Sequence, residues 1–107
     1  MIYLASDHAG FNLKEAVKAF LQKQNFDVAD MGNTALIAGD DYPDFVIPAA
    51  KKVAEDPASN KGIIFGWSGQ GEAMAANRIR GVRATVYYGG PDEIITLGRE
   101  HNNSNVL

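Results

Sequence analysis

The sequence contains no cysteine, and this absence removes several kinds of chemistry at once. Disulfides, thiolate nucleophiles and zinc sites with cysteine ligands are all excluded. Histidine occurs only twice, at positions 8 and 101, and neither HxH nor HExxH spacing is present. Two histidines so far apart in the sequence do not indicate a metal site. We therefore expect the protein to bind no metal ion.

Long apolar runs and an excess of positive charge are also missing. No segment approaches the roughly 20 apolar residues that a transmembrane helix needs. The first ten residues, MIYLASDHAG, lack the basic start of a secretory signal. The net charge is −3, whereas a nucleic-acid-binding domain would show a basic face. We therefore expect a cytoplasmic protein that binds neither membranes nor nucleic acid.

The 107 residues that are present suggest a single domain spanning 1–107, in which apolar, β-prone segments alternate with amphipathic ones. Such alternation predicts an α/β fold with a parallel sheet and right-handed crossovers. The segment 33–44, NTALIAGDDYPD, is expected to be a loop. We expect strands at 1–6, 26–32, 61–67 and 82–88, and helices at 11–24, 43–55, 72–80 and 92–101.

Polar residues gather where two of the expected strands end. Open parallel sheets bind ligands outside the carboxyl ends of their strands. The segments expected at that edge are SDHAG after the first strand, GWSGQGE after the third and YYGGP after the fourth. Because the first two carry most of the polar side chains, we expect the ligand site there.

The glycine-rich loop GWSGQGE fails three familiar templates. The dinucleotide fingerprint would need glycine at position 74, which is methionine. The nucleophile elbow begins with Gly66, Trp67 and Ser68 but has glutamine at position 70. The phosphate-binding loop of NTPases would need lysine at position 72, which is glutamate. A carboxylate there would repel a nucleotide, so we do not expect an NTPase.

The loop keeps the backbone of an anion cradle without its lysine. The N–H groups of residues 68–71 can converge on an oxygen atom at a helix start. If negative charge appears there only during a reaction, the cradle is an oxyanion hole. Glu72 could then remove a carbon-bound proton, and the cradle would hold the resulting enolate. Alternatively, Glu72 only complements the helix dipole in the first turn.

Other candidates also have two interpretations. Asp7 either caps the following helix or forms a polar pair with His8 at the ligand edge. His101 either complements the dipole at a helix end or reaches the cleft of the glycine loop. Trp67 forms a pocket wall or simply packs. The arginines Arg78, Arg80 and Arg83 form a solvated surface or bind acidic groups or a phosphate.

Four stretches together resemble the ribose-5-phosphate isomerase B family, which includes the galactose-6-phosphate isomerase subunits and the allose-6-phosphate isomerases. They are SDHAGFNLK, DDYPDF, GWSGQGEAMAANRIRGVRA and REHNNSNVL, in order and across essentially the whole chain. The resemblance implies a three-layer Rossmann-like sheet with strand order 2-1-3-4. It also implies an aldose–ketose isomerase of pentose phosphate metabolism that needs neither metal nor cofactor, with ribose 5-phosphate as the expected substrate.

The resemblance also assigns roles to single residues. One version of the family uses a cysteine base at the end of the third strand, where this chain has Gly66. The other carries G-S-G-x-G-E and uses the glutamate, and this chain matches it at Ser68, Gly69, Gly71 and Glu72. The implied catalytic residues are Glu72 as the base, Ser68 for proton traffic, and His101 with Asp7 for ring opening. The implied substrate-binding residues are His8, Tyr42, Gly69, Gln70, Gly71 and Asn102.

The sequence departs from the family after NVL. Family members usually continue with a fifth strand, a helix that crosses to a partner subunit, and arginines that grip the phosphate. We therefore expect the fifth strand to be absent, and an exposed NVL edge that favours pairing with another chain. The sequence also fits a truncated family member or a non-catalytic binding or assembly subunit. For the isomerase we expect a homodimer or higher homo-oligomer acting on a small sugar phosphate.

Overall fold

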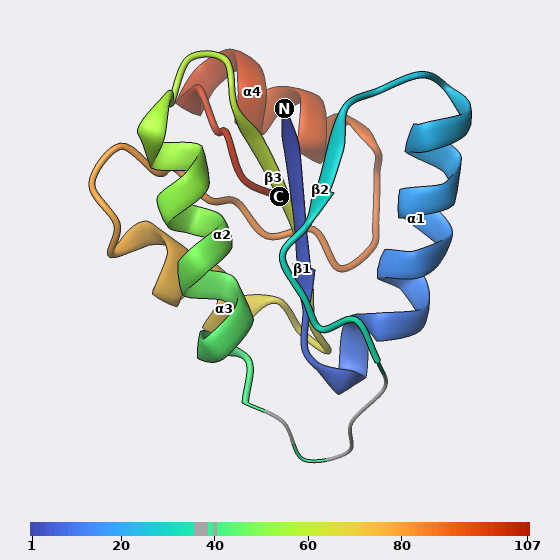
Figure 1. Ribbon diagram of the computed structural model, residues 1–107. Coiled ribbons are helices and arrows are strands. Elements are labelled where there is room, and N and C mark those ends of the chain that lie inside the picture. The colour runs from blue at the N-terminus through green and yellow to red at the C-terminus, as the bar shows by residue number, and fades with distance from the viewer. Residues whose placement is uncertain (36–38, 40) are drawn as a thin grey trace.

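A computed structural model describes residues 1–35, 39 and 41–107 as an α/β fold built on one parallel sheet (Figure 1). Residues 36–38 and 40, within the predicted loop 33–44, lie outside the described residues. The elements are β1 (Ile2–Ser6), the 3-10 helix η1 (His8–Gly10), α1 (Phe11–Lys23), β2 (Val28–Asp30), α2 (Pro43–Glu55), β3 (Lys61–Phe65), α3 (Gln70–Asn77) and α4 (Glu93–Asn102).

The three strands lie in the order β2-β1-β3 with β1 in the centre. Ile2 pairs with Val28 on one side and with Lys61 on the other, both in parallel. This confirms the first three positions of the predicted order 2-1-3-4. The central strand is apolar along its length, as expected of a parallel strand that is covered on both faces.

The fourth position is a correction to the sequence prediction. The segment 82–88 forms only an isolated bridge at Ala84, and its partner is Val106 rather than β3. Val106 also pairs with Gly62 of β3, so residues 105–107 lie between β3 and Ala84. The NVL segment is therefore not an exposed edge: Val106 is 3% exposed and paired on both sides. Sequence order misleads here because consecutive strands are neighbours only about two-thirds of the time.

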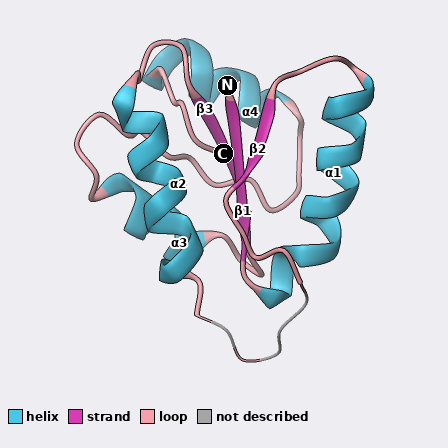
Figure 2. Cartoon of the chain, viewed as in Figure 1, coloured by secondary structure: helices cyan, strands magenta, loops and turns pink. Residues whose placement is uncertain are grey.

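Helices cover both faces of the sheet and confirm the predicted three layers (Figure 2). On one face α2 packs with α3, and its buried residues Val46, Ala50 and Val53 meet Ala76 in one core cluster. On the other face Leu21 of α1 packs with strand residues, in a second cluster with Leu4 and Phe65. Ile95 of α4 lines a cavity with Ile63 of β3, so α4 lies on the same face as α1.

A buried lysine ties α1 to the end of β2. Lys14 is fully buried, and its Nζ lies 2.6 Å from Asp30 and 3.0 Å from Glu15. Lys18 joins the same cluster, with Nζ 2.7 Å from the Asp30 carboxylate. A lysine is almost never fully buried unless it is paired. The pairing therefore accounts for the burial of Lys14 and holds α1 in place against the carboxyl edge of the sheet.

A glycine brings the loops after β1 and β3 together. A Cβ on Gly10 would overlap the carbonyl oxygen of Phe65, so any other residue would push η1 away from the end of β3. The close approach puts Asp7, at the start of η1, on the same edge of the sheet as the glycine loop. This edge carries most of the predicted site residues.

Candidate active site

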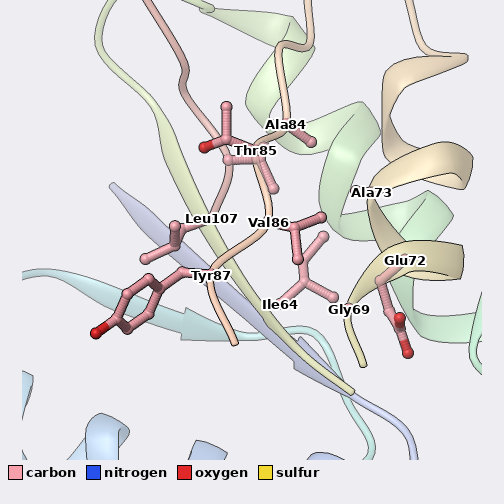
Figure 3. A pocket seen from close by; sticks show the side chains of 10 residues that line it. Ile64, Gly69, Glu72, Ala73, Ala84, Thr85, Val86, Tyr87 and Leu107 are labelled. Atoms are coloured by element: carbon pink, nitrogen blue, oxygen red, sulfur yellow. The ribbon is translucent and has the colours of Figure 1, made fainter. Parts of the chain in front are cut away.

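Glu72 lies in the first turn of α3 and is buried, with 8% of its surface exposed. Its carboxylate is packed against Gly66, just after β3. A Cβ on Gly66 would overlap Oε1 and the carboxyl carbon of Glu72, and would lie 2.8 Å from Oε2. Figure 3 shows the carboxylate oxygens turned away from Thr85 and Leu107, which line the apolar side of a small adjoining cavity. The carboxylate therefore points toward the carboxyl edge of the sheet.

The loop before Glu72 has the backbone of an anion cradle. Gly69 is the N-cap of α3 in the left-handed conformation, with φ +79°, which favours glycine. Its carbonyl accepts the N–H of Ala73, whereas the N–H groups of Gly69 and Gly71 have no hydrogen-bond partner among the described residues. The N–H of Gln70 makes only a long 3.4 Å contact to Oγ of Ser68. Free amides at a helix start are suited to hold a negatively charged oxygen.

Tyr42 lies against this cradle from the start of α2. A Cβ on Gly71 would lie 2.8 Å from the phenol oxygen of Tyr42, so the ring rests on the backbone of the loop. Tyr42 is half-buried and also packs against the α2 core cluster. The structure therefore places Tyr42 beside Gly71 and Glu72, and its role in substrate binding stays a prediction.

Asp7 is buried at the end of β1 and caps η1. Its Oδ1 accepts the N–H of Ala9 at 2.9 Å, which confirms the capping interpretation. A role for Asp7 in ring opening stays a prediction. His8 follows directly in η1 and is exposed on the same edge of the sheet.

His101 and Asn102 are not brought to Glu72 within one chain. Both are exposed at the end of α4. Shortly after them, Asn105 accepts the N–H of Gly62 near the amino end of β3. Gly66, which contacts Glu72, lies four residues further along the chain, or roughly 13 Å at the usual strand rise. The end of α4 and the Glu72 site therefore lie at opposite ends of β3.

Neither a metal centre nor a membrane span is evident in the described residues. They hold no group of three or more His, Asp or Glu side chains placed to bind a metal ion. Nor does any described helix combine the length and apolar character needed to cross a bilayer. The polar groups gathered at the site are the Glu72 carboxylate, the amides of the glycine loop and the nearby polar side chains.

Gly66 has a role that the sequence reasoning missed. Its lack of a side chain makes the space that the Glu72 carboxylate fills. The available signal was a glycine at the end of an apolar strand, followed six residues later by a glutamate at a helix start. The sequence alone does not predict the contact between Gly66 and Glu72, because the contact depends on how the loop turns at Gly69.

Comparison with known proteins identifies the family of the chain. A profile of the Ribose/Galactose Isomerase family matches residues 2–107. The chain belongs to this family. It is similar to ribose-5-phosphate isomerase B of Mycolicibacterium paratuberculosis, with 42% identity over 99% of this chain and 65% of the relative. The probable ribose-5-phosphate isomerase B of Mycoplasma genitalium is 39% identical over 99% of this chain and 68% of the relative. The chain thus spans about two thirds of the length of these family members.

Solved structures of family members share the fold. Ribose-5-phosphate isomerase B of Mycoplasma genitalium, in a structure with bound ribulose 5-phosphate, matches with a TM-score of 0.94 and 39% identity. The match covers 99% of this chain and 68% of that one. The Clostridium thermocellum ribose-5-phosphate isomerase B matches with a TM-score of 0.90 and 36% identity, over 99% of this chain and 69% of that one. The Rossmann-like architecture described above is therefore that of the family.

Proposed function

We propose that this chain interconverts an aldose phosphate and a ketose phosphate, with ribose 5-phosphate and ribulose 5-phosphate as the pair. The observation that carries the proposal is the buried Glu72 carboxylate next to the free N–H groups of Gly69 and Gly71. A base beside an anion cradle is what enolisation requires. The similar proteins named for this reaction, one with ribulose 5-phosphate bound, support the choice of substrate.

The proposed reaction needs no external oxidant or reductant. Glu72 takes the proton from C2 of the open-chain aldose, and the electron pair forms the C1–C2 double bond. The former carbonyl oxygen becomes negative and is held by the N–H groups of Gly69 and Gly71. Ser68 carries a proton between the two sugar oxygens, and Glu72 returns its proton to C1. The product is the ketose, with the same atoms as the substrate.

The remaining predicted residues take binding and ring-opening roles in this proposal. His8, Tyr42 and Gln70 surround the carboxyl edge of the sheet and would contact the sugar or its phosphate. Asp7 and His101 would open the furanose ring, and Asn102 would bind a sugar oxygen. Within one chain, however, His101 and Asn102 are exposed and lie too far from Glu72 to act on the same sugar.

We propose that a second copy of the chain supplies His101 and Asn102, so that the working form is a homodimer or higher homo-oligomer. Exposed residues at the end of α4 are free to reach the Glu72 site of a neighbour, which they cannot do within their own chain. We also place the activity in the cytoplasm, because a charged sugar phosphate does not cross a membrane unaided.

Isotope exchange tests the proposal directly. The protein is incubated with ribose 5-phosphate in deuterated water, and the sugars are examined by NMR for ketose and for deuterium at C1 or C2. We expect both in the wild type and a loss of about 10²- to 10⁴-fold in the rate for Glu72→Gln, the usual range for a general base. Glu93→Gln is the matched control, since Glu93 is exposed in the first turn of α4.

The two outcomes that contradict the proposal differ in meaning. If the wild type yields neither ketose nor label at high enzyme concentration, the chain is not an isomerase by itself, and the non-catalytic binding or assembly role fits better. If label persists in Glu72→Gln at the wild-type rate, the reaction stands but another group is the base.

A further inference from the structure

The reaction proposed above gives no role to Trp67, the single tryptophan of the chain. Trp67 follows Gly66 directly in the glycine loop and is 90% exposed, so it is not a packing residue. Tyr88, which follows the bridged segment at Ala84, is 78% exposed. An exposed aromatic ring forgoes most of the stabilisation that its burial would bring.

These two rings border the same hollow. Trp67 and Tyr88 line a cavity of about 290 Å³ together with two polar residues of the glycine loop, Ser68 and Gln70. Isolated exposed apolar residues are ordinary on protein surfaces. Two aromatic side chains that share a cavity with two hydrogen-bonding ones match the usual composition of a small-molecule site.

The hollow adjoins the Glu72 site through residues of the glycine loop. A second cavity, of about 350 Å³, is lined by Trp67, Ser68 and Tyr88 and also by Gly66 and Gly69. Gly69 in turn lines the small cavity that includes Glu72 (Figure 3). Gly69 is therefore a wall shared by the cavity at the two aromatic rings and the cavity at Glu72.

We propose that Trp67 and Tyr88 form an aromatic clip that binds the carbons of the sugar that do not react, while C1 and C2 lie at Glu72. The inference rests on the proposed isomerase function and extends it to substrate recognition. An open-chain sugar phosphate presents C–H groups along its carbon chain and hydroxyl groups at its edges. The aromatic faces suit the C–H groups, and Ser68 and Gln70 suit the hydroxyls.

Trp67 itself reports on the clip, because it is the only tryptophan. We would titrate Glu72→Gln, in which a bound sugar should be turned over far more slowly, with ribose 5-phosphate and follow the emission of Trp67. We expect a saturable shift to shorter wavelength as the ring leaves water. Ribose and inorganic phosphate, titrated separately, show which part of the ligand covers the ring: ribose alone should shift the emission at higher concentration, and phosphate alone should not.

Variants separate the clip from the reaction. In the active protein, Trp67→Ala and Tyr88→Ala should each raise KM for ribose 5-phosphate about five- to tenfold, the size of one stacked aromatic contact, and change kcat less than about twofold. Calorimetry on the same substitutions made in Glu72→Gln should show the matching loss of affinity. Phe20→Ala is the control, since Phe20 is another exposed aromatic residue, lies on α1 away from the glycine loop, and should change neither constant when replaced.

Three results would overturn the clip, and none is the failure of the isomerase itself. In the first, the wild type turns over ribose 5-phosphate while neither alanine variant changes KM. In the second, calorimetry detects ribose 5-phosphate binding without any change in Trp67 emission. In the third, raising the protein concentration shifts the emission without sugar and sugar adds nothing, so that a second copy covers the ring. Conversely, a sugar-dependent shift in a protein without turnover would support the clip and reject the reaction.

Discussion

The Glu72 carboxylate occupies the space that a side chain at position 66 would fill. Gly66 and Glu72 come from different elements, and the overlap involves both carboxylate oxygens and the carboxyl carbon. The two positions are therefore coupled, and a side chain at 66 is compatible with this site only if the carboxylate moves.

The substitution Gly66→Ala tests whether a side chain at position 66 acts on the Glu72 carboxylate or only destabilises the fold in general. The new methyl group displaces the carboxylate, and we expect the isomerase rate to fall about 100-fold, as for a misplaced catalytic group. Overpacking should also reduce the free energy of unfolding by about 1–3 kcal/mol. In a Glu72→Ala background the same change should cost much less, because the three atoms nearest to the added Cβ all belong to Glu72. Equal costs in both backgrounds, measured by urea unfolding, would contradict the contact.

Mixing two inactive variants should restore activity if a second copy completes the site. Glu72→Gln lacks the proposed base, and His101→Asn lacks the proposed ring-opening group. A mixed dimer has one site with wild-type Glu72 from one chain and wild-type His101 from the other. We expect that site to be active after the two proteins are unfolded and refolded together. Activity no greater than the sum of the separate variants would show that His101 does not act between chains.

Asp30 should make the protein sensitive to strong acid. Burial disfavours the charged form of Asp30, but hydrogen bonds from Lys14 and Lys18 outweigh it and lower the pKa of this carboxyl below its usual 3.8. A lowered carboxyl pKa contributes stability above the unfolded value, and this contribution is lost as pH falls through the folded value. The free energy of unfolding should therefore fall below about pH 3.8, and less steeply in Asp30→Asn.

At neutral pH, Asp30→Asn should itself be strongly destabilising. It leaves Lys14, which is fully buried, without its closest carboxylate, and breaking such a pair costs about 3–5 kcal/mol. Glu55→Gln is the matched control, because the Lys52–Glu55 pair is exposed and its loss should not change the unfolding midpoint measurably. An Asp30→Asn protein as stable as the control would mean that Lys14 finds another partner or leaves the interior.

Asn105 should be important for stability rather than for activity. Its amide donates to the carbonyls of Gly81 and Pro57, and its Oδ1 accepts the N–H of Arg83 at 2.8 Å. Asn105→Ala removes these three hydrogen bonds from partly buried backbone groups, and we expect a loss of about 2–4 kcal/mol in the free energy of unfolding. Asn12→Ala, an exposed position on α1, should be nearly neutral. Thermal unfolding of the two variants would decide, and equal midpoints would contradict this role.

The sequence was informative wherever local pattern decides the structure. The helix predicted at 43–55 is α2 with the same bounds, because Pro43 starts it and its apolar residues Val46, Ala50 and Val53 share one face. The loops after β1 and β3 lie at one edge of the sheet, as the rule for open parallel sheets predicts, whereas the binding role of Tyr42 stays a prediction.

The sequence prediction was wrong about which segment lies beside β3, because two segments far apart in the sequence could take that position. Segment 82–88 and residues 105–107 are both apolar enough to lie beside β3, and periodicity cannot decide between them. Tertiary contacts decide: the N–H of Gly62 bonds to Asn105, and the N–H of Ile64 bonds to Leu107. The distance between His101 and Glu72 could not be foreseen for the same reason, since it depends on where α4 ends relative to β3.

The place of residues 105–107 bears on how the chain is made. Strands β1, β2 and β3 are synthesised before residues 105–107. Until those residues emerge from the ribosome, one side of β3 has no strand partner. An open apolar strand edge invites association with other chains during synthesis. Slow translation between β3 and residues 105–107, or a shortage of chaperones during that interval, should therefore lower the yield of folded protein.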